Sequence, residues 1–196
     1  METTTSTFLG GLNEGDPEAW RRFCERYEPM LLAMTRRAAL REEDARDVVQ
    51  EVLTTAFVVG FRAGKYDSER GRLRCWLQGV AVNKIREARR RIARPEVQLT
   101  DQSDATRCLN GIADDRELPG LFEEEWERAV LVECLRRVKL EVDPKTFQAF
   151  QLYAIGGRRP EEVAAQLGIA RETVYVHKSR VLARLKELHR EIAEDW

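Results

Sequence analysis

The chain contains little of the chemistry from which metal sites and catalytic centres are built. Its 196 residues include four cysteines and two histidines, and no two cysteines form a Cys-x-x-Cys pair. With only His177 and His189 as further ligands, no zinc site is expected. The chain also lacks a Ser/His/Asp, Cys/His or phosphate-loop arrangement, which disfavours an enzyme and gives no reason to expect a cofactor. Four scattered cysteines fit the reduced thiols of a cytosolic protein.

Long apolar runs and alternating patterns are missing as well. No hydrophobic run is long enough to cross a bilayer and no signal peptide is recognisable, so we expect a cytoplasmic protein without membrane insertion. No segment alternates between apolar and polar residues over a useful length, which argues against strands. We therefore predict an all-α fold, with a length that suits one large domain or two small ones.

Charge is balanced overall but unevenly distributed. The formal net charge is −1, which by itself does not indicate a nucleic-acid partner. Residues 70–94 nevertheless carry nine Lys or Arg against one acid, Glu87, whereas residues 101–127 carry nine acids against Arg107 and Arg116. A basic segment followed by an acidic one indicates either two functions or a linker that masks its neighbour.

Helical patterns divide the chain into two small bundles. Asp16-Pro17 is a typical helix start, an N-cap followed by proline. Amphipathic stripes run from Ala45 to Phe57 and from Leu73 to Ala88. Periodicity is weak around Pro95, Gly111 and Pro119, as in a linker. The predicted segments are a disordered N-terminus (1–15), a helical domain (16–94), an acidic linker (95–120) and a second helical domain (121–196).

The last of these segments predicts a helix-turn-helix. Pro160 suits the first position of a short helix, and Gly168 can adopt the positive φ that ends it. Apolar residues then recur at helical spacing from Val174 to Leu188. A short helix packed against a longer, basic one is the geometry that places side chains in a DNA major groove.

Together the two halves resemble a known family. The run Asp44-Ala-Arg-Asp-Val-Val-Gln-Glu-Val-Leu53 is followed by Trp76-Leu-Gln-Gly-Val-Ala-Val-Asn83, a basic tail, a linker and the helix-turn-helix. This order closely resembles bacterial RNA polymerase sigma factors of the extracytoplasmic-function type. The resemblance implies a protein that binds core RNA polymerase, recognises two promoter elements and assists promoter opening, without catalysis of its own.

The resemblance also assigns a polymerase-binding surface. Its residues are Asp44, Asp47, Gln50 and Glu51, on the polar side of the predicted helix; a merely solvated face is the alternative. Arg46 occupies a position where the family usually carries an acid. Phosphorylation of Thr54 or Thr55 on the same helix is a hypothesis for restoring that negative potential, and ordinary packing is the alternative.

The minus-ten element would be read from the helix that follows. The resemblance and the basic run assign Trp76, Asn83, Lys84, Arg86, Arg89, Arg90 and Arg91 to this role. The cations suit phosphate contacts, and Asn83 suits a base edge. Trp76 shares the apolar stripe with Leu73 and Val80, which favours packing over stacking on an exposed base.

The minus-thirty-five element would be read by the last helix. Its candidate residues are Arg171, Glu172, Tyr175, Val176, His177, Lys178, Ser179 and Arg180. His177 is interpreted as a phosphate or groove contact, since no second metal ligand stands near it. Relatives usually have a small or basic residue near Tyr175 and serine near Val176.

Partners follow from the same resemblance. We expect core RNA polymerase and promoter DNA, with an anti-sigma factor or a Ser/Thr kinase as a regulator, and a monomer when free. A DNA-binding regulator is the alternative function, although it would leave the Asp47 surface unexplained. Free protein is expected to bind duplex promoter poorly, because each domain contributes only modest affinity.

Overall fold

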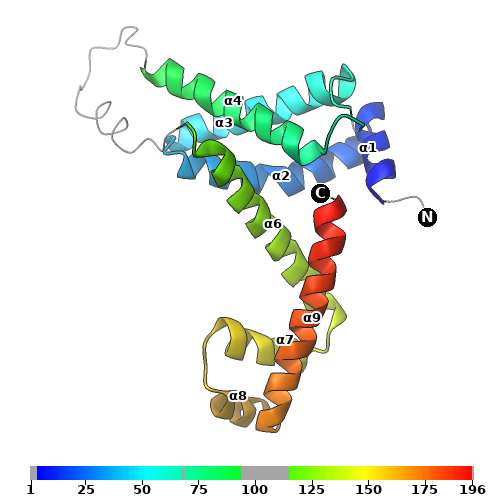
Figure 1. Cartoon of the computed structure of the whole chain (residues 1–196), viewed down its shortest axis with the longest axis vertical. Helices are drawn as coiled ribbons and strands as arrows, with labels where there is room; N and C mark the ends of the chain where they lie inside the picture. The colour runs from blue at the N-terminus through cyan, green and yellow to red at the C-terminus, as the bar shows by residue number, and fades with distance from the viewer. Residues whose placement is uncertain (1–3, 68, 94–114, 196) are drawn as a thin grey trace. The chain divides into compact units, whose positions relative to one another are not determined.

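The computed structural model describes residues 4–67, 69–93 and 115–195, and these ranges are helical without a strand (Figure 1). The prediction of an all-α fold is therefore confirmed. The chain divides into two compact units between Glu127 and Arg128, called here the first and the second unit. The elements are α1 (Thr4–Glu14), α2 (Pro17–Arg37), α3 (Glu42–Thr55), η1 (Ala56–Arg62), α4 (Leu73–Ala93), α6 (Leu118–Glu141), α7 (Pro144–Phe150), η2 (Gln151–Ile155), α8 (Pro160–Leu167) and α9 (Arg171–Asp195).

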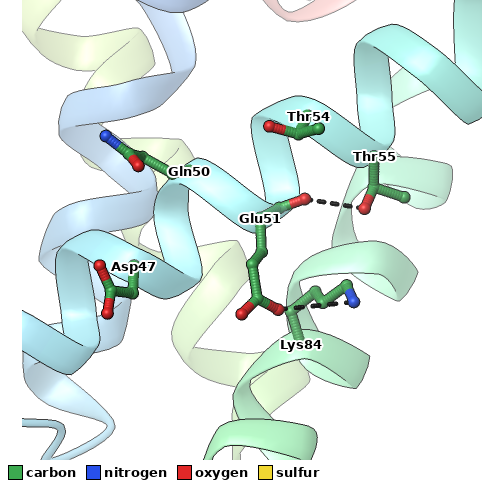
Figure 2. Close-up of a pocket in the computed structure, with 6 residues that line it drawn as sticks. All are labelled: Asp47, Gln50, Glu51, Thr54, Thr55 and Lys84. Atoms are coloured by element: carbon green, nitrogen blue, oxygen red, sulfur yellow. Dashed lines mark hydrogen bonds and ion pairs between the residues drawn. The ribbon is translucent and has the colours of Figure 1, made fainter.

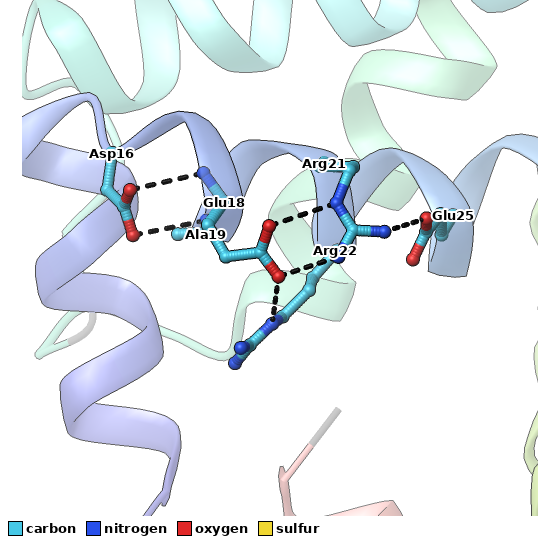
Figure 3. Close-up of polar contacts among 6 residues, drawn as sticks. All are labelled: Asp16, Glu18, Ala19, Arg21, Arg22 and Glu25. Carbon is cyan, nitrogen blue, oxygen red and sulfur yellow. Dashed lines mark hydrogen bonds and ion pairs between the residues drawn. The ribbon is translucent and has the colours of Figure 1, made fainter.

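Helix α2 begins as its sequence predicts. The Asp16 carboxylate accepts hydrogen bonds from the backbone N–H groups of Glu18 and Ala19, at 3.1 and 3.2 Å (Figure 3). Pro17 follows at the first helical position, where a missing N–H is harmless. The next turn is stabilised by the Glu18 carboxylate, which accepts from Arg21 and Arg22. Capping and helical charge pairs are local, so this start is readable from sequence.

The core of the first unit lies among α2, α3 and α4. Helix α3 contacts α2 on one side and α4 on the other. Aromatic rings of α2 stack along its buried face, with Phe23 and Tyr27 centroids 4.5 Å apart. Phe61 of η1 meets Phe23 edge-on at 5.5 Å. These contacts hold α3 in place and leave its polar side outside.

The predicted disorder of residues 1–15 is wrong for the described part of that segment. Residues 4–14 form α1, which contacts both α2 and η1. Leu12 is fully buried, and Gly11 lies so close to the Ala19 side chain that a Cβ there would be 3.0 Å from it. The helix forms because it finds a surface on which to bury Leu12, and a Thr-rich sequence gives no sign of that surface.

The predicted linker also ends earlier than expected. Residues 94–114 lie outside the described part, but α6 already begins at Leu118, within the predicted 95–120 segment. Pro119 is tolerated because it stands in the first turn. Leu118, Phe122 and Trp126 recur at helical spacing and are fully buried. The first turns of α6 therefore belong to the first unit, and the unit boundary falls at 127/128 rather than at 121.

The second unit is the predicted helix-turn-helix. Asp143 caps α7 through the N–H groups of Lys145 and Thr146, and Gly168 ends α8 at a φ of 63°. Val163 of α8 and Val174 of α9 are fully buried in a shared core with Ala149. Further along α9, the apolar positions Val181, Leu185 and Leu188 are buried as the spacing predicts.

The structure corrects the role predicted for Arg89. Its side chain is only 8% exposed, so it lies inside the first unit and not on a DNA-binding surface. One guanidinium nitrogen donates to the Ala38 carbonyl oxygen, just after α2, at 2.8 Å, and another donates to Asp115 Oδ1 at 2.7 Å. A buried cation needs such partners, and Arg89 thereby connects α4 to the end of α2 and to the segment before α6.

We predict that Arg89→Ala lowers the free energy of unfolding by about 2–4 kcal/mol, because it leaves the Ala38 carbonyl without its partner and removes the pair with Asp115. Arg90→Ala is the matched control, since Arg90 is exposed and should change stability by less than about 0.5 kcal/mol. Urea denaturation measures the free energy of unfolding of both variants. Equal stability of the two variants would contradict the buried role.

A second prediction concerns pH. Glu133 accepts hydrogen bonds from Arg136 and Arg137, and these guanidinium groups lower the pKa of its carboxyl to about 2, against an ordinary 4.5. The pairs therefore stabilise the fold above pH 4.5, and their contribution is lost as pH falls toward 2. Glu133→Gln should cost about 1 kcal/mol at pH 7, a value typical of two surface helix pairs. At pH 3, the difference in unfolding free energy between wild type and Glu133→Gln should be less than half of that at pH 7. An equal difference at both pH values would refute the role of these pairs.

Candidate functional site

The polar face of α3 forms part of a shallow hollow on the first unit. Asp47, Gln50, Glu51, Thr54 and Thr55 line it from α3, and Lys84 lines it from α4 (Figure 2). The structure thus brings together three of the four predicted polymerase-binding residues. Asp44 is half-buried one turn earlier, 3.7 Å from Arg41, and is not part of the lining. Asp47 and Gln50 are exposed and available to a partner.

Cations of α4 partly neutralise Glu51. Its carboxylate lies 3.5 Å from Lys84 Nζ and 3.1 Å from a guanidinium nitrogen of Arg91. Lys84 is also 2.9 Å from Glu87, and the two carboxylates raise the pKa of the Lys84 ammonium, with Glu87 contributing most. Residues predicted to bind polymerase and residues predicted to bind DNA are therefore paired with each other. A partner that attracts one set changes the electrostatic environment of the other.

The remaining candidates for the minus-ten element differ in exposure. Asn83, Arg90 and Arg91 are exposed on α4, whereas Lys84 and Arg86 are half-buried. Asn83 presents an amide that can both donate and accept, and the two arginines can reach phosphates. These exposed groups are the ones best placed to meet a strand of nucleic acid.

Trp76 is a packing residue in this arrangement. Its ring lies 5.7 Å from Tyr66 and 6.4 Å from Phe61, measured between centroids. A Cβ on Gly60 would stand 2.4 Å from the ring, so the indole packs directly on the backbone of η1 at a position that only glycine allows. The structure supports the packing alternative for Trp76.

An acidic segment, defined here as residues 115–125, contacts the basic side chains of α2 and α4. Asp115 pairs with Arg89 and, at 3.6 Å, with Arg86. The other contacts are Glu123 with Arg74 and Gln78, and Glu124 and Glu125 with Arg37. The acidic stretch is visible in the sequence, but its partners Arg37, Arg74 and Gln78 are not, because they lie on other helices. Of the two interpretations of the charge pattern, these contacts support an acidic segment that masks the basic side chains beside it.

The last helix presents its candidates on two sides. Those on the outer side are all exposed: Arg171, Glu172, Tyr175, Val176, Ser179 and Arg180. His177 and Lys178 are half-buried toward the inner side. His177 Nδ1 lies 3.0 Å from the hydroxyl oxygen of Thr146, which is itself buried in α7. This contact connects α9 to α7, and the phosphate or groove contact of His177 stays a prediction.

Two aromatic rings near the start of α9 pack against each other and against two neighbouring cations. Tyr153 of η2 meets Tyr175 edge-on, with centroids 5.5 Å apart. Lys178 Nζ lies 5.1 Å from the Tyr153 ring centroid, and the Arg171 guanidinium lies 6.0 Å from that of Tyr175. Arg171 also pairs with Glu161 of α8 at 3.0 Å. The sequence gives no sign of the roles of Tyr153 and Glu161, because both residues act through contacts between elements.

Among the residues that the structure describes, no group of three or more His, Cys, Asp or Glu side chains is placed to hold a metal ion. In the same ranges, no helix is both long enough and apolar enough to span a membrane.

Comparison with known proteins agrees with the division into units. Residues 23–94 match the family described as Sigma-70 region 2, and residues 132–185 match Sigma-70, region 4. No curated protein matches the chain. One similar solved structure is that of CnrH in complex with the cytosolic domain of CnrY, at 22% identity and a TM-score of 0.38, covering 94% of this chain and 96% of that one.

The two family matches account for both surfaces described above. The first match contains the α3 face and α4, and the second contains α7, α8 and the exposed side of α9. Their order along the chain is the one that the sequence motifs predict. The chain belongs to the Sigma-70 family of RNA polymerase sigma factors, which are promoter-specific DNA-binding proteins of transcription initiation.

Proposed function

We propose that this sigma factor binds core RNA polymerase through the α3 face, directs it to promoters with two DNA elements and assists their opening. The observation that carries the proposal is the exposed Asp47–Gln50 surface within the region 2 match, accompanied by a separate helix-turn-helix within the region 4 match. The chain itself performs no chemical step in this role.

Polymerase docking rests on the charge and position of α3. Asp47 and Gln50 project from a helix whose opposite side is buried through Val48, Val49 and Val52. A carboxylate held on a rigid helix steers a basic partner surface and fixes its register. Asp47 is the main contact, since Glu51 is already shared with Lys84 and Arg91.

Promoter recognition is divided between the units. In the first, Asn83 reads a base while Arg90 and Arg91 hold phosphates of the minus-ten element. In the second, the outer side of α9 enters the major groove of the minus-thirty-five element. Each contact alone is weak, and polymerase makes them act together by holding both units on one DNA.

Ion pairs of the acidic segment weaken DNA binding by the free protein. Asp115 pairs with Arg86, and Glu123 pairs with Arg74. These pairs compete with phosphates for the same guanidinium groups. Weak binding by the isolated chain is therefore part of the proposal.

Transcription reconstituted from purified core polymerase, this chain and a library of promoter fragments tests the proposed function. We expect defined start points only when the chain is present. Asp47→Lys should weaken binding to core polymerase by about tenfold or more, because it replaces attraction with repulsion. Glu28→Lys, a charge reversal at an exposed position of α2, is the control and should bind like wild type. Tight, specific duplex binding without polymerase would instead favour a DNA-binding regulator.

Regulation by an anti-sigma factor or a Ser/Thr kinase is also proposed. Arg46, at a position where the family usually has an acid, pairs with Glu42 at 2.8 Å and adds positive charge beside the α3 face. Thr54 is exposed in the hollow, whereas the Thr55 hydroxyl already donates to the Glu51 carbonyl oxygen at 2.7 Å. A phosphate on Thr54 would add about −1.5 to −2 charges to the face of α3 that carries Asp47. Thr54 is therefore the better candidate.

We predict that Thr54→Glu raises affinity for core polymerase about twofold to fivefold, since it adds one negative charge to the docking face. Thr55→Glu is the matched control and should give no gain, because Thr55 is turned into its own helix. A binding assay with purified core polymerase measures the affinity of both variants. In cells, an unchanged level of transcription with Thr54→Ala/Thr55→Ala would refute the switch.

A further inference from the structure

Two neighbouring apolar side chains stand on the side of α9 that faces away from its own core. Val176 is 54% exposed and Tyr175 is 41% exposed, whereas the other outward residues of these turns are charged or polar. Single exposed apolar residues are ordinary on protein surfaces. An adjacent pair near the beginning of a recognition helix is different, because this part of such a helix meets the base edges.

The pair is held in a defined position. The Tyr175 ring is packed edge-on against Tyr153 and lies beneath the Arg171 guanidinium. Val176 is β-branched, so in a helix it has one strongly preferred rotamer and loses little entropy on contact. Both side chains therefore offer a preformed apolar surface.

The neighbouring cation is already engaged. Arg171 is exposed, but it pairs with Glu161 at 3.0 Å, and this carboxylate competes with a guanine for the guanidinium group. The other exposed candidates on these first turns are Glu172, Tyr175 and Val176. Of these, only Val176 presents nothing but methyl groups.

The base edges in a major groove differ in what they offer to a methyl group. Guanine, adenine and cytosine present acceptors and donors, which an apolar side chain would desolvate without replacing their hydrogen bonds. Thymine alone presents a methyl group, at C5. We propose that the second unit reads a thymine of the upstream promoter element through contact between Val176, supported by Tyr175, and the thymine 5-methyl group; this rests on the proposed function.

Selection of promoter sequences by the reconstituted holoenzyme tests the proposed contact between Val176 and thymine. The probe is duplex promoter DNA with a randomised upstream element, bound by full-length chain and core polymerase. Wild type should enrich thymine at one position, and Val176→Ala should lose that preference while still selecting the remaining positions. Val132→Ala is the matched control: Val132 is 66% exposed on α6, outside the recognition helix, and its selected sequences should equal those of wild type.

A second measurement removes only the methyl group. Deoxyuridine in place of the enriched thymine should weaken wild-type binding about threefold to fivefold, as expected for one buried methyl. The Val176→Ala holoenzyme should bind both DNAs equally. Enrichment without a thymine preference, or wild-type binding indifferent to deoxyuridine, would overturn this inference alone. Failure to enrich any sequence would overturn the proposed function together with it.

Discussion

The guanidinium of Arg89 is the interaction on which the arrangement of the first unit most depends. It lies inside the bundle and bonds to the chain just after α2 and to Asp115 ahead of α6. A buried cation without such partners would be costly, so the chain segments around Arg89 are held where their oxygens can reach it. Helix α3 packs against both α2 and α4, the two helices that the Arg89–Ala38 hydrogen bond connects. The polar faces of α3 and α4 are consequently presented side by side.

That arrangement couples the two activities proposed for the first unit. Glu51 belongs to the α3 face, yet it pairs with Lys84 and Arg91 of the helix proposed to read DNA. Docking of a basic surface on α3 would compete for Glu51 and release these cations toward phosphates. The acidic segment adds a similar competition on the other basic side chains, Arg74 and Arg86. Under the proposed function, charge pairing within the unit would therefore favour DNA binding only after a partner has changed these pairs.

In the second unit, the side of α9 that we propose to face DNA packs against the elements behind it. His177 is joined to buried Thr146, and Tyr153 braces both Tyr175 and Lys178. These contacts reduce the entropy that the outer side chains would lose on binding. They also explain why the outward pair Tyr175 and Val176 keeps a defined position. In the proposed recognition, packing matters as much as the residues that would touch DNA.

The amino-acid sequence by itself determined the all-helical fold, the start of α2 at Asp16, the turn at Gly168 and the exposed face of Asp47 and Gln50. Each of these depends on caps, glycine conformations or periodicity within a few residues. Only the tertiary structure decided that Arg89 is buried, that Trp76 packs on Gly60, that His177 bonds to Thr146 and that residues 4–14 form a helix. In those cases the deciding partner lies on another element, often tens of residues away. Burial and pairing with such partners overrule what the local sequence indicates, because their free energy exceeds any local preference.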